Sequence, residues 1–383
     1  MIRPVAPPSA DEAIGSMHRP GRHAPANPAT RDLAPADGER VFARVQAAFD
    51  SATADTPDSV VELAPALAGR AARIRIVGRG LARAIAPAFA HLPRPGPGAA
   101  PELHVGLWDQ SASRVPGPRR LVDEVLPPGD ATAASTDGRW VIYRRNASVT
   151  CLDRALGRIA GWVEAGDRLA LLDRGRPLYA PLLLWLRDRR VDAAHAGLVA
   201  ADGRGILVAG ESGSGKTTTV LSCLLDGFDF VSDDYVGLEA RTGSAYVGHG
   251  LHGSTHLRPD DLWRFPRLAR HAIRGRLPEE DKALILLSEA CPERLRPAAD
   301  IDLLVLPRVT GVPGPRISPA SRSQALLRLA PSSLWMVRHA RGSGLPGLAG
   351  LVGCVPCYWL DLGGDVSAIA PLLRDLLQEA LPR

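Results

Sequence analysis

The stretch GESGSGKTTT, at positions 210–219, brings together glycines, hydroxyl side chains and a single lysine. It fits the pattern G-x-x-x-x-G-K-[ST], in which Gly210, Gly215, Lys216 and Thr217 hold the fixed positions. Glycines let backbone N–H groups close around phosphate oxygens, and the start of a following helix adds partial positive charge. The loop that we expect to bind nucleotide phosphates comprises Gly210, Glu211, Ser212, Gly213, Ser214, Gly215, Lys216, Thr217 and Thr218.

Lysine is rare in this chain, because 44 of its 46 basic residues are arginines. The two lysines are Lys216 and Lys282, and an ammonium group can enter a tight loop that a planar guanidinium cannot. We expect Lys216 to reach the β- and γ-phosphates of a nucleotide, and Thr217 to hold Mg²⁺ through its hydroxyl. Lys282 precedes an expected strand in EEDKALILL. It is interpreted either as a contact to phosphate or substrate at the rim of the site, or as an exposed lysine at a strand start.

Two adjacent carboxylates, Asp233 and Asp234, follow the apolar stretch FDFVS. Asp233 lies 17 residues after Lys216, an interval that fits one helix and one strand. P-loop proteins keep a metal-binding aspartate at the end of such a strand. One carboxylate of a pair can organise Mg²⁺ while the other accepts a proton from an attacking hydroxyl. The alternative is an Asp-Asp turn that only ends the strand.

A histidine, His195 in DAAHAGLV, is expected on a strand beside the one that leads into the loop. Histidine can serve proton transfer near neutral pH, but a lone histidine is more often structural. From the residues alone, both interpretations stay open.

Residues 195–236, HAGLVAADGRGILVAGESGSGKTTTVLSCLLDGFDFVSDDYV, resemble the core of the HPr kinase/phosphorylase family and its HPr-kinase-like relatives. In that family a histidine strand precedes the P-loop, and an Asp-Asp pair closes the next strand. Only ATP-dependent phosphoenolpyruvate carboxykinases closely share the short interval between lysine and acids. Relatives encoded beside lasso-peptide biosynthesis are similar to this chain in layout and phosphorylate a peptide serine. The C-terminal segment that engages the HPr carrier protein is not found, so the resemblance is to these relatives rather than to HPr kinase proper.

The resemblance implies that residues 210–218 bind nucleotide phosphates and that ATP and Mg²⁺ are the cofactors. It gives Asp233 the role of general base and Asp234 that of a Mg²⁺ ligand alongside Thr217, with these two roles open to exchange. It places His195 near the transferred phosphoryl group. A homo-oligomer is a further expectation, by analogy with the family.

The elements around these residues predict an α/β fold, in which a P-loop core similar to HPr kinases and carboxykinases follows a small α+β domain. GILVAG predicts the strand before the loop, and KTTTVLSCLLDG the helix after it. We predict a poorly ordered leader at 1–38, an α+β domain for substrate recognition at 39–165, and the kinase-like domain at 166–383. We also expect a helix at 156–163, and expect the strand after Lys282 to join the P-loop sheet.

Composition excludes several other classes of protein. The net charge of +5 is scattered, without a basic stripe with interleaved aromatic residues, which predicts no nucleic-acid partner. The absence of an apolar run long enough for a bilayer, and of a signal peptide's apolar stretch, predicts a cytoplasmic protein without membrane association. The five cysteines form neither a disulfide framework nor a zinc site.

Together these patterns predict an ATP-dependent, Mg²⁺-requiring kinase that transfers the γ-phosphoryl group to a hydroxyl, with a serine of a protein or peptide as the acceptor. One alternative is a small-molecule kinase or a carboxykinase-like enzyme. Another is an ATP-binding switch or ATPase without a phosphoryl acceptor, although a pure binder does not need two acids after the loop.

Overall fold

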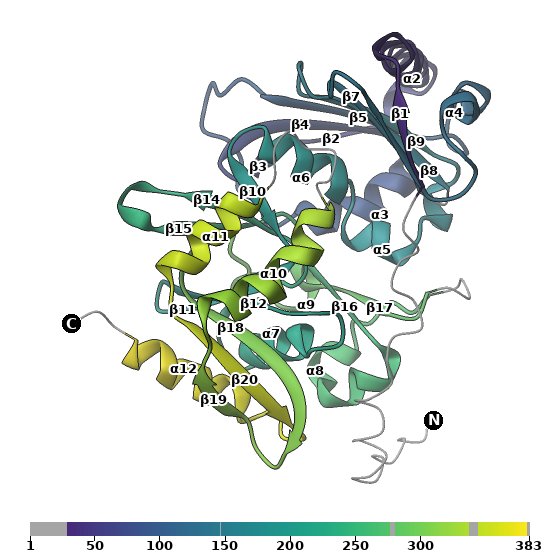
Figure 1. Cartoon of the computed structure of the whole chain (residues 1–383). Coiled ribbons are helices and arrows are strands. Elements are labelled where there is room, and N and C mark those ends of the chain that lie inside the picture. The colour runs from purple at the N-terminus through teal and green to yellow at the C-terminus, as the bar shows by residue number, and fades with distance from the viewer. Residues whose placement is uncertain (1–28, 146, 276–279, 337–343, 381–383) are drawn as a thin grey trace, which may run out of the picture.

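The computed structural model describes residues 29–145, 147–275, 280–336 and 344–380. These residues form two large mixed sheets and one two-stranded sheet, with helices packed around them (Figure 1). The α/β class expected from the sequence is therefore confirmed. Most of the predicted leader, residues 1–28, lies outside the described residues.

Ordered structure begins before the predicted end of that leader. Residues Ala29–Leu33 form strand β1, and helix α2 starts at Pro35. Strand β1 pairs in parallel with residues 131–135, and Leu33 is buried. The Pro/Ala-rich composition concealed this strand, because its order comes from backbone pairing with a distant segment rather than from local propensity.

The first sheet has nine strands and lies at the top of Figure 1. One face packs against α2 (Pro35–Asp55) and α4 (Arg119–Val125), and the other against α3 (Arg79–Phe89) and α6 (Tyr179–Arg187). The core under α6 continues into β10 (Val191–Ala194) of the second sheet through Val191 and Ala193. The strand order is β1, β6 (Ala131–Ser135), β7 (Trp140–Arg145), β8 (Ser148–Asp153), β9 (Arg158–Val163), β5 (Leu103–Asp109), β4 (Arg70–Val77) and β2 (Val60–Leu63), with β3 (Ala66–Leu67) paired to β4.

The helix predicted at 156–163 is wrong, because this segment contains strand β9. It lies between β8 and β5, and every residue after Arg158 is buried. A central strand that is covered on both faces has a continuous apolar sequence, which does not show the alternation that distinguishes a strand from a helix.

The second sheet carries the phosphate loop and also has nine strands. In β12, Ile206 and Val208 face α7 (Lys216–Leu225) and α12 (Ile369–Glu379), whereas Leu207 and Ala209 face α10 (Arg322–Met336) and α11 (Leu345–Cys354). This alternation produces a three-layer arrangement. The strand order is β10 (Val191–Ala194), β14 (Val236–Ala240), β15 (Tyr246–Gly250), β18 (Ala298–Val312), β12 (Arg204–Ala209), β11 (Ala196–Ala201) and β13 (Asp229–Ser232), while β20 (Cys357–Gly363) pairs with β18 and with β19 (Arg316–Pro319).

The strand after Lys282, β17 (Ala283–Leu286), does not join the P-loop sheet as expected. It pairs with β16 (Ser254–Leu257) in a separate antiparallel sheet. Its alternate residues are buried on both sides, Ala283 and Ile285 in the core under α7, and Leu284 and Leu286 against Leu171. The sheet of β16 and β17 therefore lies between the P-loop core and α5 (Leu171–Gly175). The remaining short helices are α8 (Pro266–Ala269), α9 (Leu287–Ala290) and the 3₁₀ turns Pro57–Ser59, Gly166–Arg168, Thr242–Ser244, Pro259–Arg264 and Pro292–Arg294.

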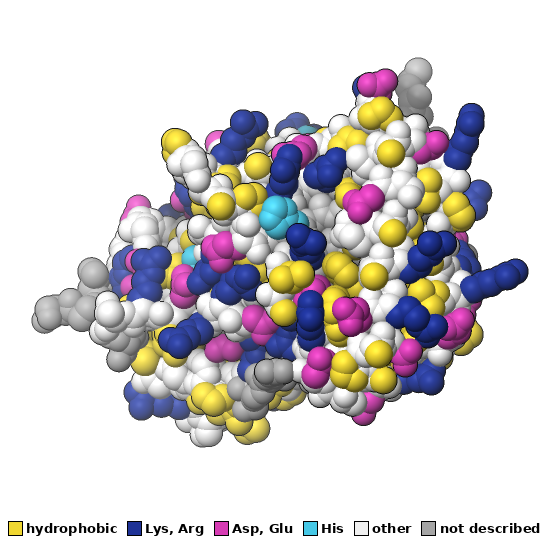
Figure 2. All heavy atoms as spheres, turned by 90° about the horizontal axis from the view of Figure 1, so that it is seen from above, with side chains coloured by type: hydrophobic (Ala, Val, Ile, Leu, Met, Phe, Trp, Pro, Cys, Tyr) yellow, Lys and Arg dark blue, Asp and Glu magenta, His cyan; other side chains and the backbone are white. Residues whose placement is uncertain are grey.

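Charges of both signs are mixed on the face seen from above the first sheet, where basic side chains alternate with Asp and Glu (Figure 2). Among the helices of the described residues, none is long and apolar enough to cross a bilayer.

Candidate active site

The phosphate loop connects β12, which ends at Ala209, to α7, which begins at Lys216. Gly213 and Gly215 have φ angles of 82° and 105°, a region that residues with a side chain rarely adopt. A Cβ atom on Gly215 would also lie 2.2 Å from Cδ1 of Leu362. The backbone path of the loop therefore requires both glycines, and Gly215 is one of the fixed glycines of the motif.

The Lys216 ammonium group lies inside the loop. Its Nζ donates hydrogen bonds to the carbonyl oxygens of Gly210 and Glu211, at 2.8 Å and 3.1 Å. The residue is only 7% exposed, and burial lowers the pKa of Lys216 although the nearby carboxylates oppose this. A buried ammonium at the helix start is placed to meet an incoming anion.

The other residues of the loop differ in their surroundings. Glu211 is exposed and forms an ion pair with Arg328. Ser212 is exposed, whereas the Ser214 hydroxyl is buried without a hydrogen-bond partner in the described part of the chain. Thr218 lies in the first turn of α7, where its carbonyl accepts a hydrogen bond from Ser222. Among these residues, Ser214 is thus the one with a buried polar group that the described chain leaves without a partner.

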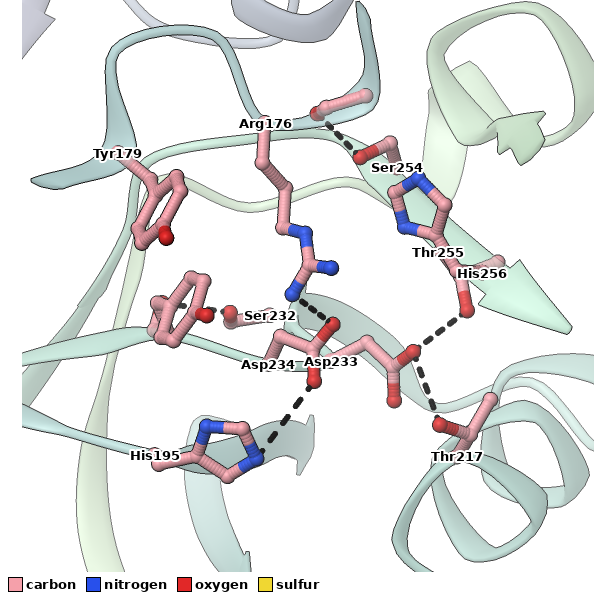
Figure 3. A network of polar contacts seen from close by, with 12 residues as sticks. Arg176, Tyr179, His195, Thr217, Ser232, Asp233, Asp234, Ser254, Thr255 and His256 are labelled. Carbon is pink, nitrogen blue, oxygen red and sulfur yellow. Dashed lines mark hydrogen bonds and ion pairs between the residues drawn. The ribbon is translucent and has the colours of Figure 1, made fainter. Parts of the chain in front are cut away.

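Asp233 directly follows β13 and points toward α7 (Figure 3). Its Oδ2 accepts hydrogen bonds from the Thr217 hydroxyl at 3.2 Å and from the Thr255 hydroxyl at 2.6 Å. Its Oδ1 is buried and has no partner among the described residues. Burial, followed by the charge of Asp234, raises the pKa of Asp233 to about 6.

Asp234 faces the opposite side of the site, where Arg176 forms an ion pair with its Oδ2 (Figure 3). The other oxygen, Oδ1, lies 3.9 Å from Nε2 of His195. Burial alone would raise the pKa of Asp234, but the Arg176 guanidinium and the neighbouring cations outweigh it and hold that pKa well below its usual range. The Ser232 hydroxyl donates to the Tyr235 carbonyl at 2.7 Å and closes the turn that carries both acids.

His195 lies between β10 and β11, with its ring edge-on to Tyr235 at 5.4 Å between ring centroids. Its backbone N–H donates to the Ser333 hydroxyl at 2.9 Å. Burial lowers the pKa of His195 to about 4, which keeps the imidazole neutral at pH 7. A neutral ring beside Asp234 can donate or accept a hydrogen bond without adding charge.

Lys282 lies at the rim, exposed, just before β17. Within the described chain it forms no hydrogen bond or ion pair, but its charge lowers the pKa values of Asp233, Asp234 and Lys216. The fold thus brings Lys216, Thr217, both aspartates and His195 together, with Lys282 acting electrostatically.

Two residues that contact the acids, Arg176 and Thr255, were not predicted from the sequence. They are 58 and 22 residues away from their partners, Asp234 and Asp233. Arg176 carries no local signal among 44 arginines. The run of polar residues in HGSTH, residues 252–256, was a signal, because polar side chains on a buried strand need internal partners.

A divalent cation fits the Asp233 side of the site. The buried, unpartnered Oδ1 of Asp233 and the Thr217 hydroxyl supply oxygen ligands of the kind that Mg²⁺ prefers. The described residues contain no cluster of three or more His, Cys, Asp or Glu side chains suited to a metal. A cation here would therefore depend on nucleotide phosphates for further ligands, as Mg²⁺ does in sites of phosphoryl transfer.

Comparison with known proteins gives partial matches. No protein-family model matches the chain. The HPr kinase/phosphorylases of two strains of Treponema pallidum, one of them the Nichols strain, are each 40% identical to it over 62 residues. Over this stretch the chain is similar to HPr kinase/phosphorylases. The matched stretch is 16% of this chain and spans only 19% of the length of each relative.

A solved structure, the Hpr(Ser) kinase/phosphatase from Coxiella burnetii, also matches the chain. The match has 15% sequence identity and a TM-score of 0.27, and covers 49% of this chain and 97% of the other. With a TM-score this low, the assignment of a P-loop core rests on the strand, loop and helix described above.

Proposed function

We propose that the chain is an ATP-dependent kinase that transfers the γ-phosphoryl group to a hydroxyl. The observation that carries this proposal is the separation of the two acids. Asp233 bonds to Thr217 of the phosphate loop, whereas Asp234 turns to Arg176 and His195. One carboxylate thus serves the nucleotide side and the other is available to an acceptor, an arrangement that a nucleotide-binding switch does not require.

On the nucleotide side, the loop amides and Lys216 would bind the phosphates of ATP. Thr217 and Asp233 would hold Mg²⁺, which when bound neutralises charge on the β- and γ-phosphates. This exchanges the roles first given to the two acids. The proximity of Asp233 to Thr217 favours the exchange, because both ligands then lie on the same side of the site.

On the acceptor side, Asp234 would take the proton of the attacking hydroxyl. The hydroxyl oxygen forms a bond to the γ-phosphorus, the bond from that phosphorus to the β,γ-bridging oxygen breaks, and ADP leaves. The transition state of phosphoryl transfer is loose, so the proton leaves late and the base needs position more than strength. An ionised Asp234 with one oxygen near His195 meets that requirement. Lys282 would add positive charge at the rim, near the transferred group.

The acceptor that we propose is a serine of a protein or peptide, which extends the resemblance of residues 195–236 to HPr-kinase-like proteins. The proposal assigns recognition to residues 39–165, because Arg145 of β7 pairs with Asp173 of α5, next to the Arg176 that binds Asp234. Residues 166–383 would then form the kinase-like domain. A cytoplasmic location and a homo-oligomer belong to the same proposal.

The test uses γ-labelled ATP, Mg²⁺ and the full chain, with cell lysate or candidate peptides as acceptors. We expect label on a serine, with transfer reduced at least about a hundredfold in Asp234→Asn while ATP binding is kept. We expect Asp233→Asn to weaken the dependence of ATP binding on Mg²⁺. Label released only as free phosphate in wild-type protein would contradict the kinase and favour an ATPase.

A further inference from the structure

The segment His252–His256 contacts both halves of the candidate site. Ser254 and His256 point toward the short segment around Arg176, while Thr255 points to the other side (Figure 3). Three contacts hold the segment around Arg176, namely His252 Nε2 to the Pro177 carbonyl at 2.9 Å, Ser254 Oγ to the Gly175 carbonyl at 2.5 Å and His256 Nε2 to the Leu171 carbonyl at 3.1 Å. Because side chains alternate along a strand, one strand can serve two partners in this way.

The second side of the segment fixes Asp233. The Thr255 hydroxyl donates to Asp233 Oδ2 at 2.6 Å, and Thr255 itself is 1% exposed. The same segment therefore touches one acid directly and holds the backbone on either side of Arg176, which bonds to the other acid.

Arg176 is also fixed through its guanidinium. The side chain is 11% exposed, and its Cζ lies 5.1 Å from the ring centroid of Tyr235. Tyr235 stacks on Tyr179, with 4.9 Å between ring centroids and planes only 4° apart. At the far end of this stack, Arg145 of β7 lies over Tyr179 at 5.2 Å. The arginine is thus held by backbone hydrogen bonds and by an aromatic stack, and has little freedom to turn away from Asp234.

We propose that Arg176 is a positioning residue for Asp234, and that the segment His252–His256 sets the direction of both carboxylates. The role rests on the proposed kinase function. By occupying Oδ2, Arg176 leaves Oδ1 as the oxygen directed toward His195 and an acceptor hydroxyl. A carboxylate without this partner would rotate, and displacement of a reacting group by about 1 Å can cost about a hundredfold in rate.

A purely structural role for Arg176 would have a different signature. An ion pair that only joins two parts of the chain would lower stability when lost, without a selective effect on the rate of transfer. The decisive readout is therefore the ratio of the change in kcat to the change in KM for ATP, with the free energy of unfolding measured in parallel.

The experiment compares Arg176→Gln, Arg176→Lys and the control Arg174→Gln in the full chain. Arg174 lies in the last turn of α5, two residues before Arg176, and within the described chain bonds to neither acid. We expect Arg176→Gln to lower kcat about a hundredfold, with KM for ATP within twofold of wild type. Arg176→Lys should restore at least a tenth of wild-type kcat. The control Arg174→Gln should keep kcat within twofold of wild type. Ser254→Ala, which keeps Arg176 and removes one support of its backbone, should lower kcat less, about three- to tenfold.

Wild-type kcat in Arg176→Gln, or no gain from lysine over glutamine, would overturn the positioning role. If Arg176→Gln does not fold, Ser254→Ala decides, and wild-type kcat in that variant overturns the role of the segment. Wild-type protein that binds ATP with Mg²⁺ but labels no acceptor would instead overturn the kinase proposal, and the positioning role with it.

Discussion

Asp233 and Asp234 are adjacent residues after β13, but their carboxylates lie in opposite electrostatic surroundings. From the described residues, Asp233 receives two hydroxyl donors and no cation, and burial raises its pKa to about 6. Asp234 forms an ion pair with Arg176, and its pKa is held well below the usual range despite burial. Neighbouring residues of the same type thus contribute to the stability of the ligand-free chain with opposite signs.

The first prediction concerns the isosteric amides of these two acids. Above pH 6 the wild-type chain holds a buried Asp233 carboxylate that ionises more easily in the unfolded chain, because its folded pKa is raised. As pH rises from 4 to 6, ionisation of this buried carboxylate therefore lowers the free energy of unfolding of the wild type. Asp233→Asn removes that cost, so the variant should have a higher free energy of unfolding than wild type at pH 8, without a matching gain at pH 4. Asp234→Asn should instead lower it by about 3 kcal/mol or more, because Arg176 loses its buried partner.

Urea unfolding of the ligand-free protein at pH 8 and pH 4 measures both effects. A stabilised Asp234→Asn, or an Asp233→Asn that loses stability at pH 8, would contradict the assigned environments. The rate of phosphoryl transfer is measured in parallel, since both variants are expected to lose it whatever their stability.

A second prediction concerns the type of cation in the phosphate loop. Lys216 is buried between two carbonyl oxygens, and its ammonium fills a space that a planar guanidinium does not fit. Lys216→Arg should therefore bind ATP at least about tenfold more weakly than wild type, close to the value for Lys216→Met, even though it keeps the charge. Isothermal titration with ATP and Mg²⁺ measures this, and an Arg variant within threefold of wild type would contradict it.

Sequence patterns predicted the phosphate loop and the acids because these residues lie within one continuous stretch of strand, loop, helix and second strand. Gly213, Gly215 and Lys216 are constrained by the local backbone path, so their spacing alone carries the information. The strands at β7, β8 and β20 were also predictable, since their apolar runs are bounded by turns or charged residues. Residue types and their spacing were thus sufficient to predict an element or a site wherever the residues involved are close in the chain.

Residues brought together by tertiary packing were not predictable in this way. Arg176 and Thr255 meet the acids only because β16 and β17 form their own small sheet between α5 and the P-loop core. No periodicity in the chain indicates that β17 pairs with β16 rather than joining the larger sheet. Similarly, β1 is ordered by pairing with β6, about a hundred residues away.

A third prediction separates backbone strain from steric clash in the loop. Gly215 and Gly203 both have positive φ, at 105° and 78°, but only a Cβ on Gly215 would meet Leu362, at 2.2 Å. Gly203→Ala should cost about 1–2 kcal/mol of unfolding free energy through its backbone conformation alone. Gly215→Ala should cost more than this, because Leu362 must also move.

Leu362→Ala provides the matched background for this comparison. In that background the extra cost of Gly215→Ala over Gly203→Ala should shrink, since the clashing methyl group is gone. Denaturant unfolding measures the two glycine variants in both backgrounds and Leu362→Ala itself, five variants in all. An equal cost at the two glycines in the wild-type background would contradict the clash.

The last prediction concerns acid stability and the buried histidines near the site. His252 is 6% exposed, packs against Phe89 at 5.3 Å between ring centroids, and burial lowers its pKa to about 3. The unfolded chain takes up a proton at this residue below about pH 6.5, while the folded chain does not. Its contribution to stability is therefore complete above pH 6.5 and is lost progressively as pH falls toward 3.

Each such histidine should make the free energy of unfolding fall by up to about 1.4 kcal/mol per pH unit in that window. His252→Gln removes one titrating group, so its free energy of unfolding should decline less steeply than wild type between pH 6 and pH 4.5. His104→Gln is the control, because His104 is exposed on β5. Urea titrations at several pH values give the slopes. An unchanged slope in His252→Gln, or an equal reduction in His104→Gln, would show that a neutral, buried His252 is not the source of the acid sensitivity.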